Sequence, residues 1–115
     1  MIAGFRTTLR RDAANDYLRT HQRIPESVAD VMLEEGLVSW RIWIDGSTVF
    51  HMIETRDGLE ELFRRLAARG SIDAEWDAVL HELVDDDPDS SAILPLVWGM
   101  DRSRQWHLAD CDPAS

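Results

Sequence analysis

Apolar residues recur along the chain with two different periods, one typical of strands and one typical of helices. Residues 37–45 show the two-residue period, with these apolar side chains on one face: Val38, Trp40, Ile42 and Ile44. The turn dipeptide Asp45-Gly46 follows and residues 48–54 resume a β-rich run, so this region predicts a hairpin of two strands. Residues 2–9 are apolar and Thr-rich, which predicts an earlier strand.

Two pairs of helices are expected, one before and one after the hairpin, because apolar residues recur there every three or four positions. In the first pair, Asp12 offers an N-cap to one helix, and Pro25 and Gly36 bound the next. In the second pair, Asp57 can cap a helix that Gly70 ends. The last helix is expected to turn the following side chains inward: Ile72, Trp76, Val79, Leu80, Leu83 and Val84.

The final part of the chain predicts a strand and a tail. Residues 92–100 are apolar enough for a strand, and Pro95 favours an edge position because proline has no N–H for a neighbouring strand. The acidic run at 84–91 predicts a solvated loop, with an acidic metal site as the alternative. We expect one domain over residues 1–100 and a C-terminal tail over residues 101–115.

The order strand, two helices, two strands, two helices, strand predicts an α+β fold. It corresponds to the ferredoxin-like β-α-β-β-α-β sandwich with each helix split in two. Right-handed crossovers place the first and third strands in the middle of the sheet and the other two at its edges. With all helices on one face, the other face, including Arg41 and Trp43, needs another cover, which predicts a homodimer.

The composition narrows the partners and the compartment. The chain has 115 residues, with 12 Lys and Arg against 22 Asp and Glu, giving a net charge of −10. This charge disfavours nucleic acid and anionic membranes, so a small molecule or a protein is the expected partner. The single cysteine, Cys111, and the lack of a signal-peptide pattern predict the cytoplasm. No apolar run approaches the ~20 residues of a membrane helix.

Motifs for phosphate loops, HExxH metal sites, paired cysteines and nucleophile elbows do not occur in the sequence. The remaining candidates for chemistry are Tyr17, His21, Trp40 and Trp76, with His51 and His81 as lesser ones. Tyr17 and His21 are one helical turn apart and could line a pocket, or could lie at the rim of the core with their polar ends in solvent. Trp40 and Trp76 could be ordinary core residues or could wall a sugar pocket.

In order and spacing, several segments resemble the L-rhamnose mutarotase family: Tyr17-Leu18-Arg19-Thr20-His21, Pro25-Glu26, Gly36, Trp40 to Asp45, Glu54, Trp76 and Leu96-Val97-Trp98. The resemblance extends over residues 2–100. It implies the dimeric α/β-barrel type of ferredoxin-like fold. It also implies an isomerase that interconverts the α and β anomers of a deoxyhexose without a cofactor or a metal.

The resemblance also implies roles for four residues. His21 matches the family's catalytic histidine, the proton donor, and Tyr17 matches a tyrosine that contacts the substrate. Trp40 stands where the family usually has a sugar-binding tyrosine. Trp76 matches the first member of a tryptophan pair, whose second member is replaced here by Asp77.

One further departure from the family keeps two other functions open. The segment Gln22-Arg23-Ile24-Pro25-Glu26 is one residue shorter than the family's usual Asn-Pro-Ile-Trp-Pro-Glu and lacks its tryptophan. Similar dimeric barrels include cofactor-free monooxygenases that act on aromatic substrates. A non-catalytic sugar-binding module is the other alternative.

Overall fold

The computed structural model describes residues 1–107 and contains a four-stranded antiparallel sheet. Its strands are β1 (Ile2–Thr8), β2 (Leu37–Asp45), β3 (Thr48–Thr55) and β4 (Ser91–Leu94). The strand order β2-β3-β1-β4 confirms the prediction that the first and third strands are central. This is the sheet of a ferredoxin-like fold, with one hairpin and two helical crossovers.

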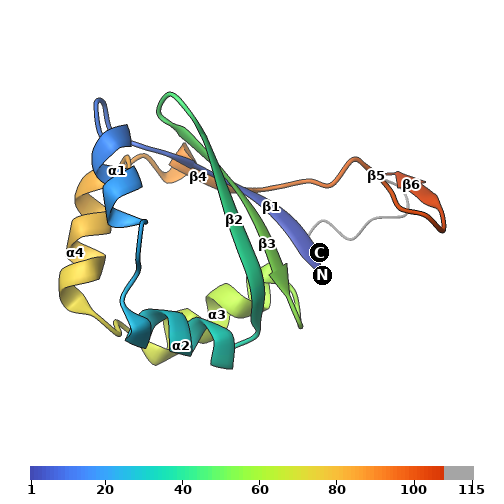
Figure 1. Ribbon diagram of the computed structural model, residues 1–115, viewed down its shortest axis with the longest axis horizontal. Helices are drawn as coiled ribbons and strands as arrows, with labels where there is room; N and C mark the ends of the chain where they lie inside the picture. The colour runs from blue at the N-terminus through green and yellow to red at the C-terminus, as the bar shows by residue number, and fades with distance from the viewer. Residues whose placement is uncertain (108–115) are drawn as a thin grey trace.

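Four helices cover one face of the sheet (Figure 1). They are α1 (Ala14–Thr20), α2 (Glu26–Glu34), α3 (Leu59–Arg69) and α4 (Ala74–Leu83). The helices pack against the sheet through two apolar clusters. One cluster lies between α1, α4 and the sheet and contains Leu9, Ala13, Tyr17, Val49 and Leu83. The other lies under α3 and contains Ala3, Ile53, Leu59 and Leu62.

Two predicted N-caps are wrong. Asp12 precedes α1 by two residues, adopts a φ of 60°, and does not cap the helix with its side chain. Asp57 instead accepts a hydrogen bond from Arg65, 2.7 Å away, and the N–H of Gly58 donates to the hydroxyl of Thr55. In both places a longer-range contact or a turn replaced the local cap that the residue type suggested.

The inward faces of two elements also differ from the prediction. A bulge in β2 shifts the register between Leu37 and Ser39, so Leu37 packs on the core while Val38 is exposed. On the last helical segment, Ile72 and Val79 are exposed as well. Trp40 does face the helices, as predicted, and Trp43 faces the open side of the sheet.

The last predicted strand is wrong in length. Strand β4 ends at Leu94, directly before Pro95, because proline cannot donate the next ladder hydrogen bond. Strand β5 (Trp98–Met100) then pairs with β6 (Gln105–His107) in a separate hairpin, which stands away from the rest of the molecule (Figure 1). This hairpin spans the expected domain boundary at residue 100, and Cys111 lies outside the described residues. A short 3₁₀ helix, η1 (Pro88–Ser90), lies within the acidic run.

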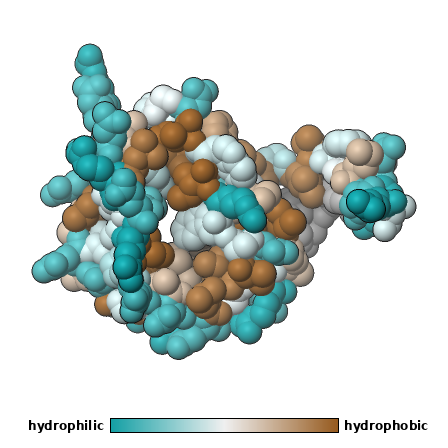
Figure 2. Space-filling view, viewed as in Figure 1, coloured by the Kyte–Doolittle hydropathy of each residue, from teal (hydrophilic) through white to brown (hydrophobic). Residues whose placement is uncertain are grey.

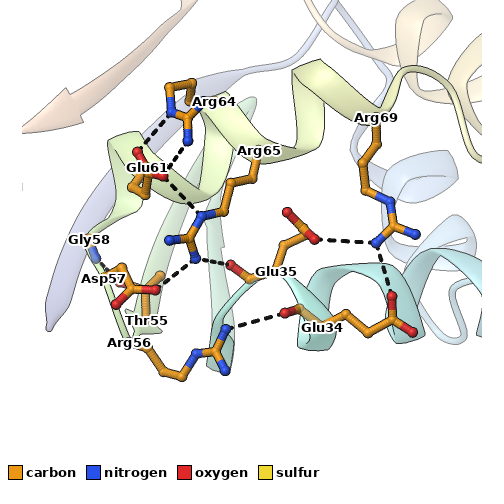
Figure 3. Close-up of polar contacts among 10 residues, drawn as sticks. All are labelled: Glu34, Glu35, Thr55, Arg56, Asp57, Gly58, Glu61, Arg64, Arg65 and Arg69. Carbon is orange, nitrogen blue, oxygen red and sulfur yellow. Dashed lines mark hydrogen bonds and ion pairs between the residues drawn. The ribbon is translucent and has the colours of Figure 1, made fainter.

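Arginines from neighbouring elements cap the C-terminal end of α2 (Figure 3). Arg56 donates to the carbonyl of Glu34 at 3.2 Å, and Arg65 donates to the carbonyl of Glu35 at 3.0 Å. Arg69 reaches the carboxylates of both glutamates. The end of a helix exposes unpaired carbonyls and partial negative charge, so these cations hold α2 against α3 and β3.

Candidate active site

A cavity of about 410 Å³ lies between the helices and the sheet. Figure 2 shows this hollowed face, with apolar residues gathered around it. The residues that line it are His21, Gln22, Arg23, Ile24, Val28, Ala29, Met32, Leu33, Leu37, Trp40, Ile42, Trp76 and Leu80. Its charged and titratable side chains, His21 and Arg23, and the amide of Gln22 all come from the connection between α1 and α2. The rest of the wall is apolar, which suits a ligand with both polar and apolar surface.

His21 follows the last turn of α1 and is held there by its own helix. Its backbone N–H and its ring Nδ1 both lie within hydrogen-bond distance of the carbonyl oxygen of Tyr17, at 3.1 and 3.0 Å. A carbonyl oxygen can only accept, so Nδ1 carries a proton. The other ring nitrogen, Nε2, is therefore the one available to a molecule in the cavity.

Burial lowers the pKa of His21 below its ordinary 6.5 and outweighs the opposing effect of the hydrogen bond to Tyr17. The imidazole is therefore neutral near pH 7, with a lone pair on Nε2. A neutral imidazole with this tautomer can take a proton from a hydroxyl group and return it. Chemically, His21 could therefore act first as a general base and, after one proton transfer, as a general acid.

Tyr17 lies behind His21 rather than among the residues that line the cavity. Its ring stacks on the imidazole with centroids 4.0 Å apart and an angle of 27° between the planes. The phenol is buried, and burial raises its pKa to about 12, so it stays protonated throughout the neutral range. Tyr17 therefore fixes the plane of the imidazole from behind.

Trp40 and Trp76 both line the cavity, one from the sheet and one from α4. The centroid of the Trp76 ring lies 5.4 Å from that of His21. Asp73 caps α4 by accepting from the backbone N–H of Trp76, which fixes the start of this helix. The topology therefore brings together His21, Trp40 and Trp76 from three separate elements.

A second cavity of about 400 Å³ lies between α2, α3 and α4. It shares part of its wall with the first cavity, namely Val28, Met32, Trp76 and Leu80. These four side chains border both cavities.

The two lesser histidine candidates have opposite environments. His81 is exposed on α4, with its Nε2 3.9 Å from Asp86, and does not line the cavity. His51 is buried on β3 and bonds to Trp40 and Thr7, a connection that sequence reasoning missed. The signal available in the sequence was its place between Val49 and Ile53, which makes it an inward-facing polar residue in an apolar strand face.

Neither a metal site nor a membrane span is found in the part of the chain that the structure describes. Within residues 1–107, no group of three or more His, Cys, Asp or Glu side chains is arranged to hold a metal ion. The acidic run instead contributes an ion pair of 2.8 Å between Asp86 and Arg10. None of the helices in this range has the length and apolarity that crossing a bilayer requires.

Comparison with known proteins gives a family and a fold. None of the curated proteins matches the chain. A crystal structure of an L-rhamnose mutarotase from Formosa agariphila is 19% identical, covers 88% of this chain and 99% of its own, and has a TM-score of 0.68. A crystal structure of a protein from Agrobacterium tumefaciens, also 19% identical, covers 84% and 94% with a TM-score of 0.47. The sequence profile described as L-rhamnose mutarotase matches residues 3–107, so the chain belongs to the L-rhamnose mutarotase family.

Proposed function

We propose that this protein is a mutarotase that interconverts the anomers of a deoxyhexose such as L-rhamnose, with His21 as the acid-base group. The proposal rests on the observation that His21 lines a cavity bounded by two tryptophans while its Nδ1 is engaged by the carbonyl of Tyr17, which leaves Nε2 for a ligand. The family match supports the same reaction. No observation favours a monooxygenase or a non-catalytic module.

The reaction needs only one proton to move within the sugar. Nε2 of His21 takes the proton of the anomeric hydroxyl O1, the bond between C1 and the ring oxygen O5 breaks, and C1 becomes an aldehyde carbon. The imidazolium then gives the proton to O5, which is bonded to the same carbon in the closed ring. Rotation about the bond between C1 and C2, followed by the reverse steps, yields the other anomer.

The remaining predicted site residues support this chemistry in different ways. Trp40 and Trp76 offer flat apolar surfaces on which the C–H groups of a pyranose can pack. Tyr17 holds the imidazole in place by stacking, and the substrate contact that the family resemblance implies for it stays a prediction.

We further propose a cytoplasmic homodimer that forms through the open face of the sheet. The face away from the helices carries apolar side chains that a monomer leaves exposed, including Ile2, Trp43 and Phe50. In the sheet register, Phe50 lies directly opposite Trp43 on β2 and Arg6 on β1, so the two exposed aromatic side chains are adjacent. Contiguous apolar surface of this kind is typical of an interface.

Saturation transfer between the anomeric protons of L-rhamnose tests the reaction directly. We expect the wild-type protein to accelerate exchange and His21→Ala to lose about 10²- to 10⁴-fold of that acceleration, the usual contribution of a placed acid-base group. His81→Ala is the matched control, since this histidine is exposed and outside the cavity. Equal rates for His21→Ala and wild type would refute the assignment, and sugar binding without acceleration would refute the mutarotase.

A further inference from the structure

A buried chain of hydrogen bonds crosses three strands beneath the cavity. The indole N–H of Trp40 on β2 donates to Nδ1 of His51 on β3 at 2.9 Å. The other ring nitrogen of His51, Nε2, lies 3.1 Å from the hydroxyl oxygen of Thr7 on β1. Since an indole nitrogen can only donate, Nδ1 must carry the lone pair, and Nε2 of the neutral ring donates to Thr7.

This chain takes up the only polar group of Trp40. His51 is not among the residues that line the cavity, so the N–H points into the sheet floor and the indole offers apolar ring surface to a ligand. The rings of Trp40 and His51 lie 5.6 Å apart between centroids, at 46°. Trp40 therefore cannot donate to a sugar hydroxyl without giving up its bond to His51.

His51 is suited to hold this position at any ordinary pH. Burial lowers the pKa of His51 to about 4, with a smaller contribution from the repulsion of His21 when that ring is protonated. The imidazole stays neutral, so the Nδ1 lone pair persists. The groups that face its ring are Phe5 and Thr7 on β1 and Trp40 on β2, with His21 as its titratable neighbour.

We propose that His51 is a positioning residue, which fixes the ring of Trp40 as the apolar wall of the sugar cavity by accepting its indole N–H. The expected effect on KM rests on the proposed mutarotase function, whereas the hydrogen bond between Trp40 and His51 does not. Without the acceptor, a buried N–H would lose its partner, and the indole would rotate to recover one from solvent or ligand. Sugar affinity would then change, while proton transfer at His21 would not.

Two substitutions separate this role from a general loss of packing. His51→Leu keeps most of the side-chain volume and removes the acceptor, whereas His51→Asn can place its carbonyl oxygen near the position of Nδ1. We expect His51→Leu to raise KM for L-rhamnose roughly 2- to 10-fold, the worth of one net hydrogen bond, with kcat within about twofold of wild type. His51→Asn should keep most of the wild-type KM.

The hydrogen bond itself is read from the ¹H–¹⁵N signal of the Trp40 indole, assigned with Trp40→Phe. This signal should move in His51→Leu and move much less in His51→Asn. Because it needs no activity, it tests the positioning even if the protein accelerates no anomer exchange, so the two proposals can fail separately. On a Trp40→Phe background, which has no indole N–H, His51→Leu should add nothing to the change in KM.

Three results would overturn the inference. One is an unmoved indole signal in His51→Leu, and another is a fall in kcat with KM unchanged. The third is an equal rise in KM with and without the indole at position 40. If His51→Leu does not fold, His51→Asn still decides the question, because a KM or an indole signal far from wild type in that variant counts against the proposal.

Discussion

His51, which is buried, and His21, which is half-buried, differ in what their second ring nitrogen can reach. His51 has both ring nitrogens engaged, by Trp40 and Thr7, and is closed to a ligand. His21 has only Nδ1 engaged by its own helix and keeps Nε2 for the cavity. Burial lowers the pKa of both rings. Under the proposed function, the same residue type would serve as a fixed acceptor at position 51 and as a proton carrier at position 21.

The pH dependence of catalysis follows from the pKa of His21. That pKa lies below 6.5, so the ring is already neutral at pH 7 and gains a proton only on acidification. We expect the protein-dependent exchange rate to be flat around neutral pH and to fall as the pH drops through the His21 pKa, because protonated Nε2 cannot take the O1 proton.

Polarimetry of freshly dissolved L-rhamnose, with the uncatalysed rate subtracted at each pH, measures this profile. His81→Ala should give the same curve as wild type. A catalysed rate that increases on acidification below pH 6 would show that the charged imidazole is the working form, contrary to the neutral imidazole in the proposed mechanism.

Sequence spacing was sufficient for some of these residues and insufficient for others. The i, i+4 relation of Tyr17 and His21 predicted their shared face, and the two-residue period of β2 predicted that Trp40 faces the helices. The bond between Trp40 and His51 depends on the register of two strands and on side-chain rotamers, which no local pattern encodes. A polar residue on an inward strand face was the only hint.

A glycine with a positive φ, Gly36, connects α2 to β2. Gly36 adopts a φ of 119°, and an added Cβ would meet the guanidinium nitrogens of Arg56 and Arg65 at 3.5 Å. These are the arginines that cap α2. A Cβ at that distance would be in ordinary contact, so it is the backbone conformation, with its positive φ, that requires glycine here.

Gly36→Ala is expected to destabilise the protein by about 1–3 kcal/mol, because residues with a side chain rarely adopt this backbone conformation. Urea denaturation measures the free energy of unfolding. Gly4→Ala is the control, since its Cβ would sit 3.7 Å from Leu94 at an ordinary contact distance. Equal stability of the two variants would contradict the strain argument.

Strong hydrophobic periodicity predicted the helices and strands correctly. Helix caps and a strand end that were predicted from a single residue, such as Asp12 or Pro95, were wrong. All four helices and the β2-β3 hairpin occur where the pattern placed them. Asp12 and Asp57 did not cap, because α1 starts two residues after the first and Arg65 engages the second. Pro95 ended β4 instead of lying within it, since the missing N–H stops the ladder.

The molecule as a whole is less compact than its length suggests. Its radius of gyration is 15.0 Å, against about 13 Å for a typical domain of 100 residues. The β5-β6 hairpin accounts for much of the extension, standing away from the sheet on the side opposite the helices (Figure 1). Val97, Trp98 and Met100 are exposed in and beside this hairpin. Both it and the open sheet face are available to a second copy of the chain.

Trp43→Glu should weaken the proposed homodimer, because it places a charge beside Phe50 on the open face of the sheet, where the wild-type indole is 55% exposed. Light scattering at micromolar concentration should give twice 13.2 kDa for wild type and a lower mass for the variant. Val79→Glu, on the exposed side of α4, is the matched control and should keep the wild-type mass. A monomeric wild-type protein, or a variant that stays dimeric, would count against this interface.

The size of the ligand that the first cavity can hold depends on the few side chains that it shares with the second cavity. Trp76, together with Val28, Met32 and Leu80, lines both the first cavity, of about 410 Å³, and the second, of about 400 Å³. We expect a smaller side chain at position 76 to join the first cavity to the second, which lies between α2, α3 and α4. A larger ligand, such as a sugar with a bulky substituent, would then fit, while His21, the proposed acid-base group, stays unchanged.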